Sequence, residues 1–151
     1  MIRVLAVGKK HQPWIEPGIK RYQTRLHKPW DLNWQLVPHS NFQADKARDE
    51  ESTRLLKHLK PDDYVILLDE IGSQLTSPAY ANKLQSTMAN GRNIVFVIGG
   101  AYGVNTQMHQ RADLILSLSS MVYPHQMVRL ILTEQLYRAQ EIAKNSSYHH
   151  I

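Results

Sequence analysis

The chain has 151 residues, of which 42% are hydrophobic and 21% charged, which excludes a disordered protein and predicts one globular domain over residues 1–151. It has no cysteine, which excludes disulfides, thiolate metal sites and cysteine nucleophiles. The net charge is +5 and no apolar run approaches the ~20 residues of a membrane span or resembles a signal peptide, so we expect a cytoplasmic protein without a membrane partner.

Short apolar runs alternate with helical patterns along the whole chain. In chain order, the patterns predict a strand at 2–7, a helix at 13–27, a strand at 31–37, a helix at 44–59, a strand at 64–68, a helix at 77–88, a strand at 93–98, a short helix at 105–111, a strand at 114–118, a long helix at 125–144 and a polar tail at 145–151. We expect Ser77 to cap its helix, with Pro78 in the first turn. Such alternation is typical of an α/β fold with a mostly parallel sheet flanked by helices, in which ligands bind at the carboxyl ends of the strands.

The predicted strand at 93–98 runs into a glycine-rich segment, residues 99–103. Glycines there allow a ligand to approach the backbone closely, but the segment is equally typical of a plain tight turn. It is not a dinucleotide-binding fingerprint, because the first glycine of that pattern would fall at Ile98. Asp69 ends another buried strand, as a response-regulator phosphoacceptor does. Because Gly99 stands where that fold requires a hydroxyl, we interpret Asp69 as a cap of a turn or helix.

The eight histidines show no spacing typical of a metal site, so we expect no metal. His125 opens the last predicted helix, and Arg129 follows one turn later on the same face. Together they could bind phosphate or, equally, stabilise the packing of this turn. The first two turns of that helix are apolar almost all round, which indicates burial on a second side. We interpret that side as the interface with a partner subunit, and the alternative is a central helix of the monomer.

Several ordered segments carry a resemblance to a known family. They are Ile98-Gly-Gly-Ala-Tyr-Gly103, Leu116-Ser-Leu-Ser-Ser-Met-Val-Tyr-Pro-His125, Arg129, Glu134-Gln-Leu-Tyr-Arg-Ala139 and Tyr148-His149, with Val4-Leu-Ala-Val-Gly-Lys9 and Leu67-Leu-Asp69. In this order they resemble the SPOUT-class methyltransferases over the whole chain. Among these, the chain is most similar to the small enzymes that methylate N3 of a pseudouridine in large-subunit (23S) ribosomal RNA.

The resemblance implies a C-terminal trefoil knot, a homodimer with the active site at its interface, S-adenosylmethionine as methyl donor, and no metal. Carried over by position, the cofactor contacts fall on Leu68, Gly100, Ser119, Ser120, Met121, Val122, Tyr123 and Pro124. The implied catalytic side chains are His125, Arg129, Tyr148 and His149. The resemblance implies that the tail folds over the active site, whereas its composition alone predicts a frayed end. His150 stands where the family usually has arginine.

The basic residues concentrate in the first part of the chain. Residues 1–60 hold 12 Lys or Arg against 6 Asp or Glu, whereas residues 61–151 hold 6 against 7. We expect RNA, within the assembled ribosome, to contact Lys9, Lys10, Lys20, Arg21 and Arg25. The alternative is an ordinary solvated surface. Two competing functions are an inactive RNA-binding α/β module and a nucleotide-binding regulator, and the missing dinucleotide fingerprint disfavours the second.

Overall fold

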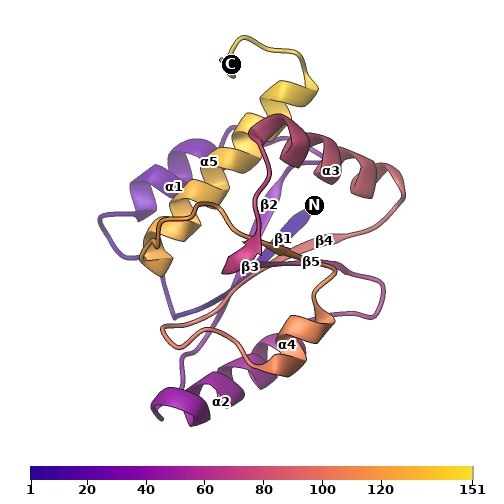
Figure 1. Ribbon diagram of the computed structural model, residues 1–151. Coiled ribbons are helices and arrows are strands. Elements are labelled where there is room, and N and C mark those ends of the chain that lie inside the picture. Colours follow the sequence, from indigo (N-terminus) through magenta and orange to yellow (C-terminus); the bar gives the residue numbers. More distant parts are fainter. Residues whose placement is uncertain (151) are drawn as a thin grey trace.

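Five strands form one sheet in the computed structural model, which describes residues 1–150 (Figure 1). They are β1 (Ile2–Val7), β2 (Leu32–Val37), β3 (Tyr64–Ser73), β4 (Ile94–Ile98) and β5 (Leu114–Leu116). Their order is β2-β1-β4-β3-β5, and every neighbouring pair is parallel. The central strands read as continuous apolar runs because both faces of the sheet are covered. The prediction of an α/β fold with a mostly parallel sheet is confirmed.

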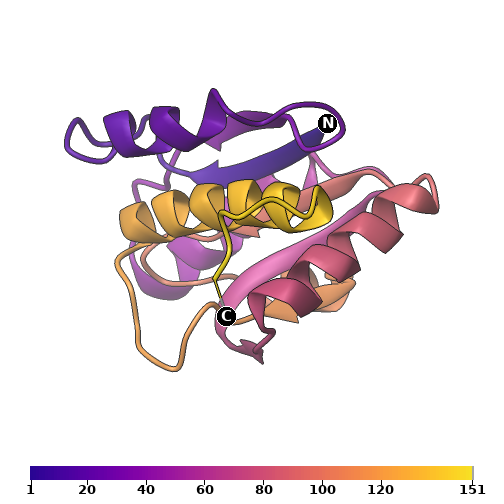
Figure 2. The ribbon, with the colours of Figure 1, turned by 90° about the horizontal axis from the view of Figure 1, so that it is seen from above.

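Helices cover both faces of this sheet, which gives three layers (Figure 1). One face carries α1 (Glu16–Gln23), α3 (Ser77–Ala89) and α5 (His125–Ala143), and the other carries α2 (Ala44–Leu56) and α4 (Thr106–Arg111). Figure 2 shows α5 lying between α1 and α3. Among residues 1–150, no helix combines the length and the apolar character needed to cross a membrane.

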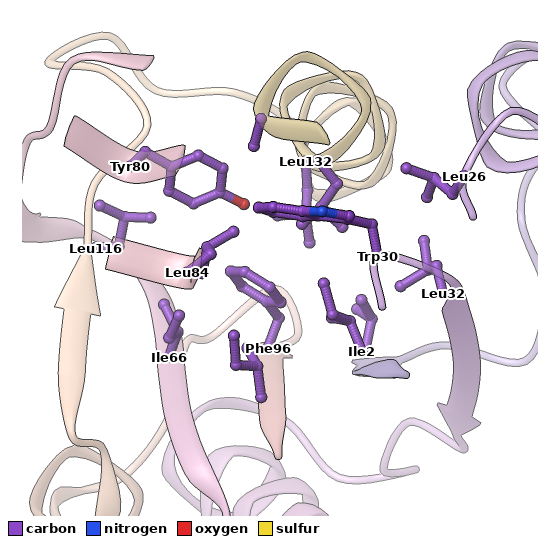
Figure 3. Packing of buried hydrophobic residues seen from close by; sticks show 14 of the residues in the cluster. Ile2, Leu26, Trp30, Leu32, Ile66, Tyr80, Leu84, Phe96, Leu116 and Leu132 are labelled. Atoms are coloured by element: carbon purple, nitrogen blue, oxygen red, sulfur yellow. The ribbon is translucent and has the colours of Figure 1, made fainter. Parts of the chain in front are cut away.

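The larger core lies beneath α1, α3 and α5 (Figure 3). Phe96 and Ile66 point up from the sheet toward Tyr80 and Leu84 of α3, while Leu132 comes down from α5. A second core on the opposite face joins the alternate residues of the same strands to α2 and α4. Apolar side chains on both faces of the sheet pack against helices, and this packing holds the carboxyl ends of the strands along one edge.

The structure corrects three local predictions. The first helix is shorter than 13–27, because the chain leaves it after Gln23 and the His27 N–H donates to the Gln140 side chain of α5 instead. Thr76, not Ser77, caps α3: its hydroxyl accepts from the Ala79 N–H at 3.2 Å. The third strand continues past Leu68 through an irregularity to Ser73, which pairs with β5.

Candidate active site

A cavity of about 210 Å³ lies at the carboxyl ends of β3, β4 and β5. Three segments that are distant in the sequence form its walls: the continuation of β3, the glycine-rich loop after β4, and the loop from β5 to α5. Of the residues expected to hold a cofactor, the cavity is lined by Leu68, Gly100, Ser119, Met121, Val122 and Tyr123. We call this space the first cavity.

The other two expected cofactor residues lie in the same β5–α5 loop but not in the lining. Ser120 accepts a hydrogen bond from the Gln74 side chain at 2.8 Å, and Pro124 precedes the first residue of α5. The loop also holds its own shape, since the Ser119 hydroxyl accepts from the Met121 N–H at 3.0 Å. Met121 and Val122 are 74% and 75% exposed, so this loop presents apolar side chains at the mouth of the first cavity.

The glycine-rich loop is both a tight turn and a cavity wall. Gly103 has φ +74°, a conformation that favours glycine, and its N–H donates to the Gly100 carbonyl at 3.1 Å. A Cβ at Gly99 would lie 2.9 Å from Val104 Cγ1. The turn therefore needs its glycines for its own geometry, and as a result it exposes backbone rather than side chains to the first cavity.

The lining suits a ligand with a flat apolar part and several polar groups. Leu68, Leu116 and Val128 provide apolar surface, while the glycine loop offers backbone N–H and C=O groups. The Ser117 hydroxyl lies in the same wall, donating to the Ser119 carbonyl at 2.8 Å. Such a mixture of apolar walls and a few polar groups is typical of a nucleoside-type cofactor site.

A second cavity, of about 640 Å³, adjoins the first. Gly100 and His125 line both, so these two residues form the shared wall. Most of its remaining lining comes from the loops after β1 and β2, the glycine loop and α2, and includes Lys9, Lys10, His39, Ser40, Phe42, Glu51 and Tyr102. The sequence reasoning missed the loop after β2, although β2 also ends at this edge of the sheet.

Arg129 does not face either cavity. It is fully buried, and its guanidinium donates to the carbonyl oxygens of Val7 at 2.8 Å and Lys10 at 3.0 Å, and to His11 Nδ1 at 3.2 Å. Its hydrogen bonds hold the backbone after β1 against α5. Of the two roles left open by the sequence, this geometry favours packing of the turn over phosphate binding.

His125 lies between the two cavities as a neutral imidazole. Burial and the nearby Arg129 charge lower its pKa, and the Glu51 carboxylate opposes them with a smaller effect. At neutral pH, His125 can therefore donate or accept a hydrogen bond at this shared wall, but it does not carry a fixed positive charge for a phosphate.

The tail packs on α5. The Tyr148 hydroxyl donates to Glu134 at 3.1 Å, its ring meets the Tyr137 ring edge-on at 4.8 Å, and Arg138 Nη1 donates to His149 Nδ1 at 3.2 Å. Burial and Glu134 raise the pKa of Tyr148 to about 12, so the phenol stays protonated and acts as a donor. These contacts hold Tyr148 and His149 against α5, while residues 145–147 and His150 are exposed. Tyr148 and His149 do not line the cavities of their own chain.

The basic residues separate into two groups. Lys9 and Lys10 are exposed at the second cavity, whereas Lys20, Arg21 and Arg25 are exposed on and just after α1. The two groups are joined by the loop that Arg129 holds.

Asp69 behaves as a turn cap. Its carboxylate accepts from the Ile71 N–H at 3.1 Å and lies 3.1 Å from His109 Nε2. Within the part of the chain that the structure describes, residues 1–150, no three His, Asp or Glu side chains are grouped so that they could hold a metal ion.

Comparisons with known proteins agree with this architecture. The profile of the family described as "Predicted SPOUT methyltransferase" matches residues 1–149. A protein of Christiangramia forsetii named Ribosomal RNA large subunit methyltransferase H is 38% identical over 154 residues, covering 99% of this chain and 98% of its own. A protein of the same name from Halothermothrix orenii is 41% identical over 157 residues, covering 98% of each. The solved structure of a probable methylase family protein from Haemophilus influenzae superposes on this chain with a TM-score of 0.56 and 17% sequence identity. The match covers 95% of this chain and 66% of the Haemophilus chain, which shows a shared fold.

Proposed function

The chain belongs to the SPOUT methyltransferase family, and we propose that it methylates N3 of a pseudouridine in large-subunit ribosomal RNA with S-adenosylmethionine as donor. The observation that carries this proposal is the first cavity. It gathers six of the eight residues expected to contact the cofactor, from three strand ends that lie far apart in the sequence. The name of the curated relatives supports ribosomal RNA as the substrate.

The residues of the first cavity fit S-adenosylmethionine. Leu68, Leu116 and Val128 would contact the adenine, and the backbone around Gly100 would bind the polar edges of the cofactor. When bound, the cofactor supplies a methyl group on a positively charged sulfur, which is already activated for transfer. The protein then has to orient the acceptor, exclude water and accept the proton that N3 loses.

We propose a homodimer as the active form. The apolar residues Met127, Val128, Leu130 and Ile131 are only half-buried in one chain, whereas the face of α5 toward the core includes Arg129 and other polar residues. This outer apolar face is suited to a second copy. Since Tyr148 and His149 lie apart from the cavities of their own chain, the dimer would bring this tail to the cavity of the partner.

The RNA substrate is expected to be presented by the assembled ribosome in the cytoplasm. The chain offers exposed cations, Lys9, Lys10, Lys20, Arg21 and Arg25, on one small domain, so a preformed RNA surface would supply the rest of the recognition. The resemblance places an arginine where this chain has His150, so the several N–H donors of a guanidinium are absent at that position. The trefoil knot remains a prediction from the resemblance.

The decisive experiment combines cofactor binding with mapping of the product. S-adenosylmethionine should bind the wild-type protein in a calorimetric titration, and mass mapping should find one pseudouridine unmethylated in ribosomal RNA from a strain lacking the gene. An inactive RNA-binding module would not bind S-adenosylmethionine, and its loss from the strain would leave the methylation unchanged. Either of those results would overturn the proposed function.

A further inference from the structure

The second cavity contains a buried carboxylate with an unused hydrogen-bond acceptor. Glu51 of α2 is 4% exposed, and its Oε2 accepts from the Ser40 N–H at 2.9 Å. Its Oε1 has no hydrogen-bond partner among residues 1–150. A buried carboxylate oxygen without a donor is costly, so such an oxygen points to a donor that a ligand brings.

The position of Oε1 is at the shared wall of the two cavities. A Cβ on Gly100 would lie 2.5 Å from this oxygen, so the absence of a side chain at Gly100 is what leaves room for it. Gly100 and His125 are also the residues that line both cavities. A methyl donor in the first cavity and an acceptor in the second would therefore meet beside Glu51.

The rim of the second cavity has the side chains that a nucleotide requires. Phe42 and Tyr102 are 55% and 43% exposed although they are large aromatic residues, and each can stack on a base. Lys9 and Lys10 can bind the flanking phosphates. Aromatic rings, cations and a buried acceptor in one cavity are typical of binding of a base flipped out of its stack.

We propose that the second cavity binds the acceptor base and that Glu51 Oε1 accepts the proton of its N3–H group. This inference rests on the proposed function and identifies the proton acceptor that the reaction requires. The N3–H bond breaks as the O–H bond forms on Glu51. The electron pair left on N3 forms the new N–C bond, while the S–C bond of the donor breaks and its pair stays on sulfur, which becomes a neutral thioether. The proton leaves Glu51 to solvent after the product departs.

Several titratable groups line the second cavity together with Glu51. They are His39, Tyr102, His125, Lys9 and Lys10, from the loops after β2, β4 and β1 and from the start of α5. Burial and the Arg129 charge lower the pKa of His125, so its imidazole is neutral at neutral pH and can share hydrogen bonds at this wall.

The variant Glu51→Gln tests the assignment, because glutamine keeps an oxygen for the Ser40 N–H but does not accept the proton. We expect kcat for ribosomal substrate to fall by about 100-fold or more, with the affinity for S-adenosylmethionine within twofold of wild type. The matched control is Glu50→Gln, since Glu50 is the neighbouring glutamate and pairs with Arg54 on the exposed side of α2. The control should keep wild-type kcat.

The pH profile distinguishes a proton acceptor from a structural residue. Without Glu51, N3 must ionise by itself, so the rate of Glu51→Gln should rise about tenfold per pH unit between about pH 7 and 9, while wild type and Glu50→Gln stay flat. A uniformly lower but equally flat profile would overturn the assignment. So would a large loss of S-adenosylmethionine affinity, because Glu51 would then bind the amino group of the cofactor.

A second pair of variants keeps the inference testable if Glu51→Gln does not fold. Phe42→Ala and Tyr102→Ala lie at the exposed rim and should raise KM for the ribosomal substrate at least fivefold, with unchanged cofactor affinity. Unchanged KM in both variants would exclude the second cavity as the acceptor site. Wild-type activity separates the two hypotheses: an inactive wild type contradicts the proposed function, whereas an active wild type with active variants contradicts only this inference.

Discussion

The guanidinium of Arg129 lies where a side chain at Gly8 would need to be. A Cβ on Gly8 would be 2.7 Å from Arg129 Nη2, and Gly8 has φ +127°, which L side chains rarely adopt. Arg129 in turn donates to the Val7 carbonyl at 2.8 Å. The end of β1 and the start of α5 therefore fix each other, and with them the loop that carries Lys9 and Lys10.

We expect Gly8→Ala to lower the free energy of unfolding by about 2–4 kcal/mol, because it adds backbone strain and displaces a buried guanidinium. The matched control is Gly91→Ala: Gly91 has φ +74°, but a Cβ there would meet nothing within 4 Å. The control should cost only about 1 kcal/mol. Urea unfolding measures both, and equal losses would contradict the role of the Gly8–Arg129 contact.

The proposed dimer interface predicts different outcomes for two neighbouring residues of α5. Ile131 is half-buried in one chain, so Ile131→Asp should dissociate the dimer and leave a folded monomer, as measured by light scattering and circular dichroism. Leu132 is fully buried in the core, so Leu132→Asp should unfold the chain. A wild-type protein that is already a folded monomer would contradict the interface.

Neutralising the basic surface should weaken RNA binding without affecting the cofactor. Replacing Lys9, Lys10, Lys20, Arg21 and Arg25 by glutamine should reduce the slope of log K against log salt by up to about 0.9 for each phosphate that is no longer neutralised. The exposed Lys57 and Lys60 serve as the control pair. An unchanged slope would show that the five residues form an ordinary solvated surface and do not contact RNA.

Truncation of the tail should separate catalysis from folding. Deleting residues 147–151 removes the Tyr148 contacts with Glu134 and Tyr137, and we expect methyl transfer to be abolished while S-adenosylmethionine affinity stays within about threefold of wild type. Tyr148→Phe keeps the aromatic packing and loses only the hydrogen bond, so it should retain most of the activity. Full activity of the truncated protein would exclude a role for the tail.

The stability should decrease in mild acid. The pKa values of His11 and His125 are lowered in the folded protein, mainly by burial and then by Arg129. Below the ordinary histidine pKa of ~6.5, the unfolded chain therefore binds protons that the folded chain resists, and the free energy of unfolding falls as the pH falls. It should be constant above about pH 7. Denaturation midpoints from pH 5 to 8 measure this, and His11→Gln with His125→Gln should flatten the curve; an unflattened curve would assign the effect to other groups.

The strands and the first cavity were largely predictable from the sequence. Apolar runs such as 64–68 and 93–98 mark strands buried on both faces, because their pattern depends only on neighbouring residues. Parallel strands end at one edge, so the segments after them could be expected to meet. What no local pattern indicated is that β3 continues to Ser73, which requires Gly72: a Cβ there would lie 2.5 Å from the Ile115 carbonyl oxygen.

The second cavity, the role of Arg129 and the place of the tail were decided by tertiary structure. Glu51 lies in a polar helix and Ser40 in a loop, and no local sequence pattern marks either residue as part of a site. They become part of one only because α2 packs beside β1 and the glycine loop. The sequence left Arg129 with two possible roles, phosphate binding or packing of the turn. The folded chain decides for packing, because the guanidinium donates to three partners more than 115 residues away. Local sequence determines which segments form strands and helices, because that depends on periodicity and turn residues. The burial and hydrogen-bond partners of a polar side chain depend on what the order β2-β1-β4-β3-β5 brings next to it, and so they follow only from the folded chain.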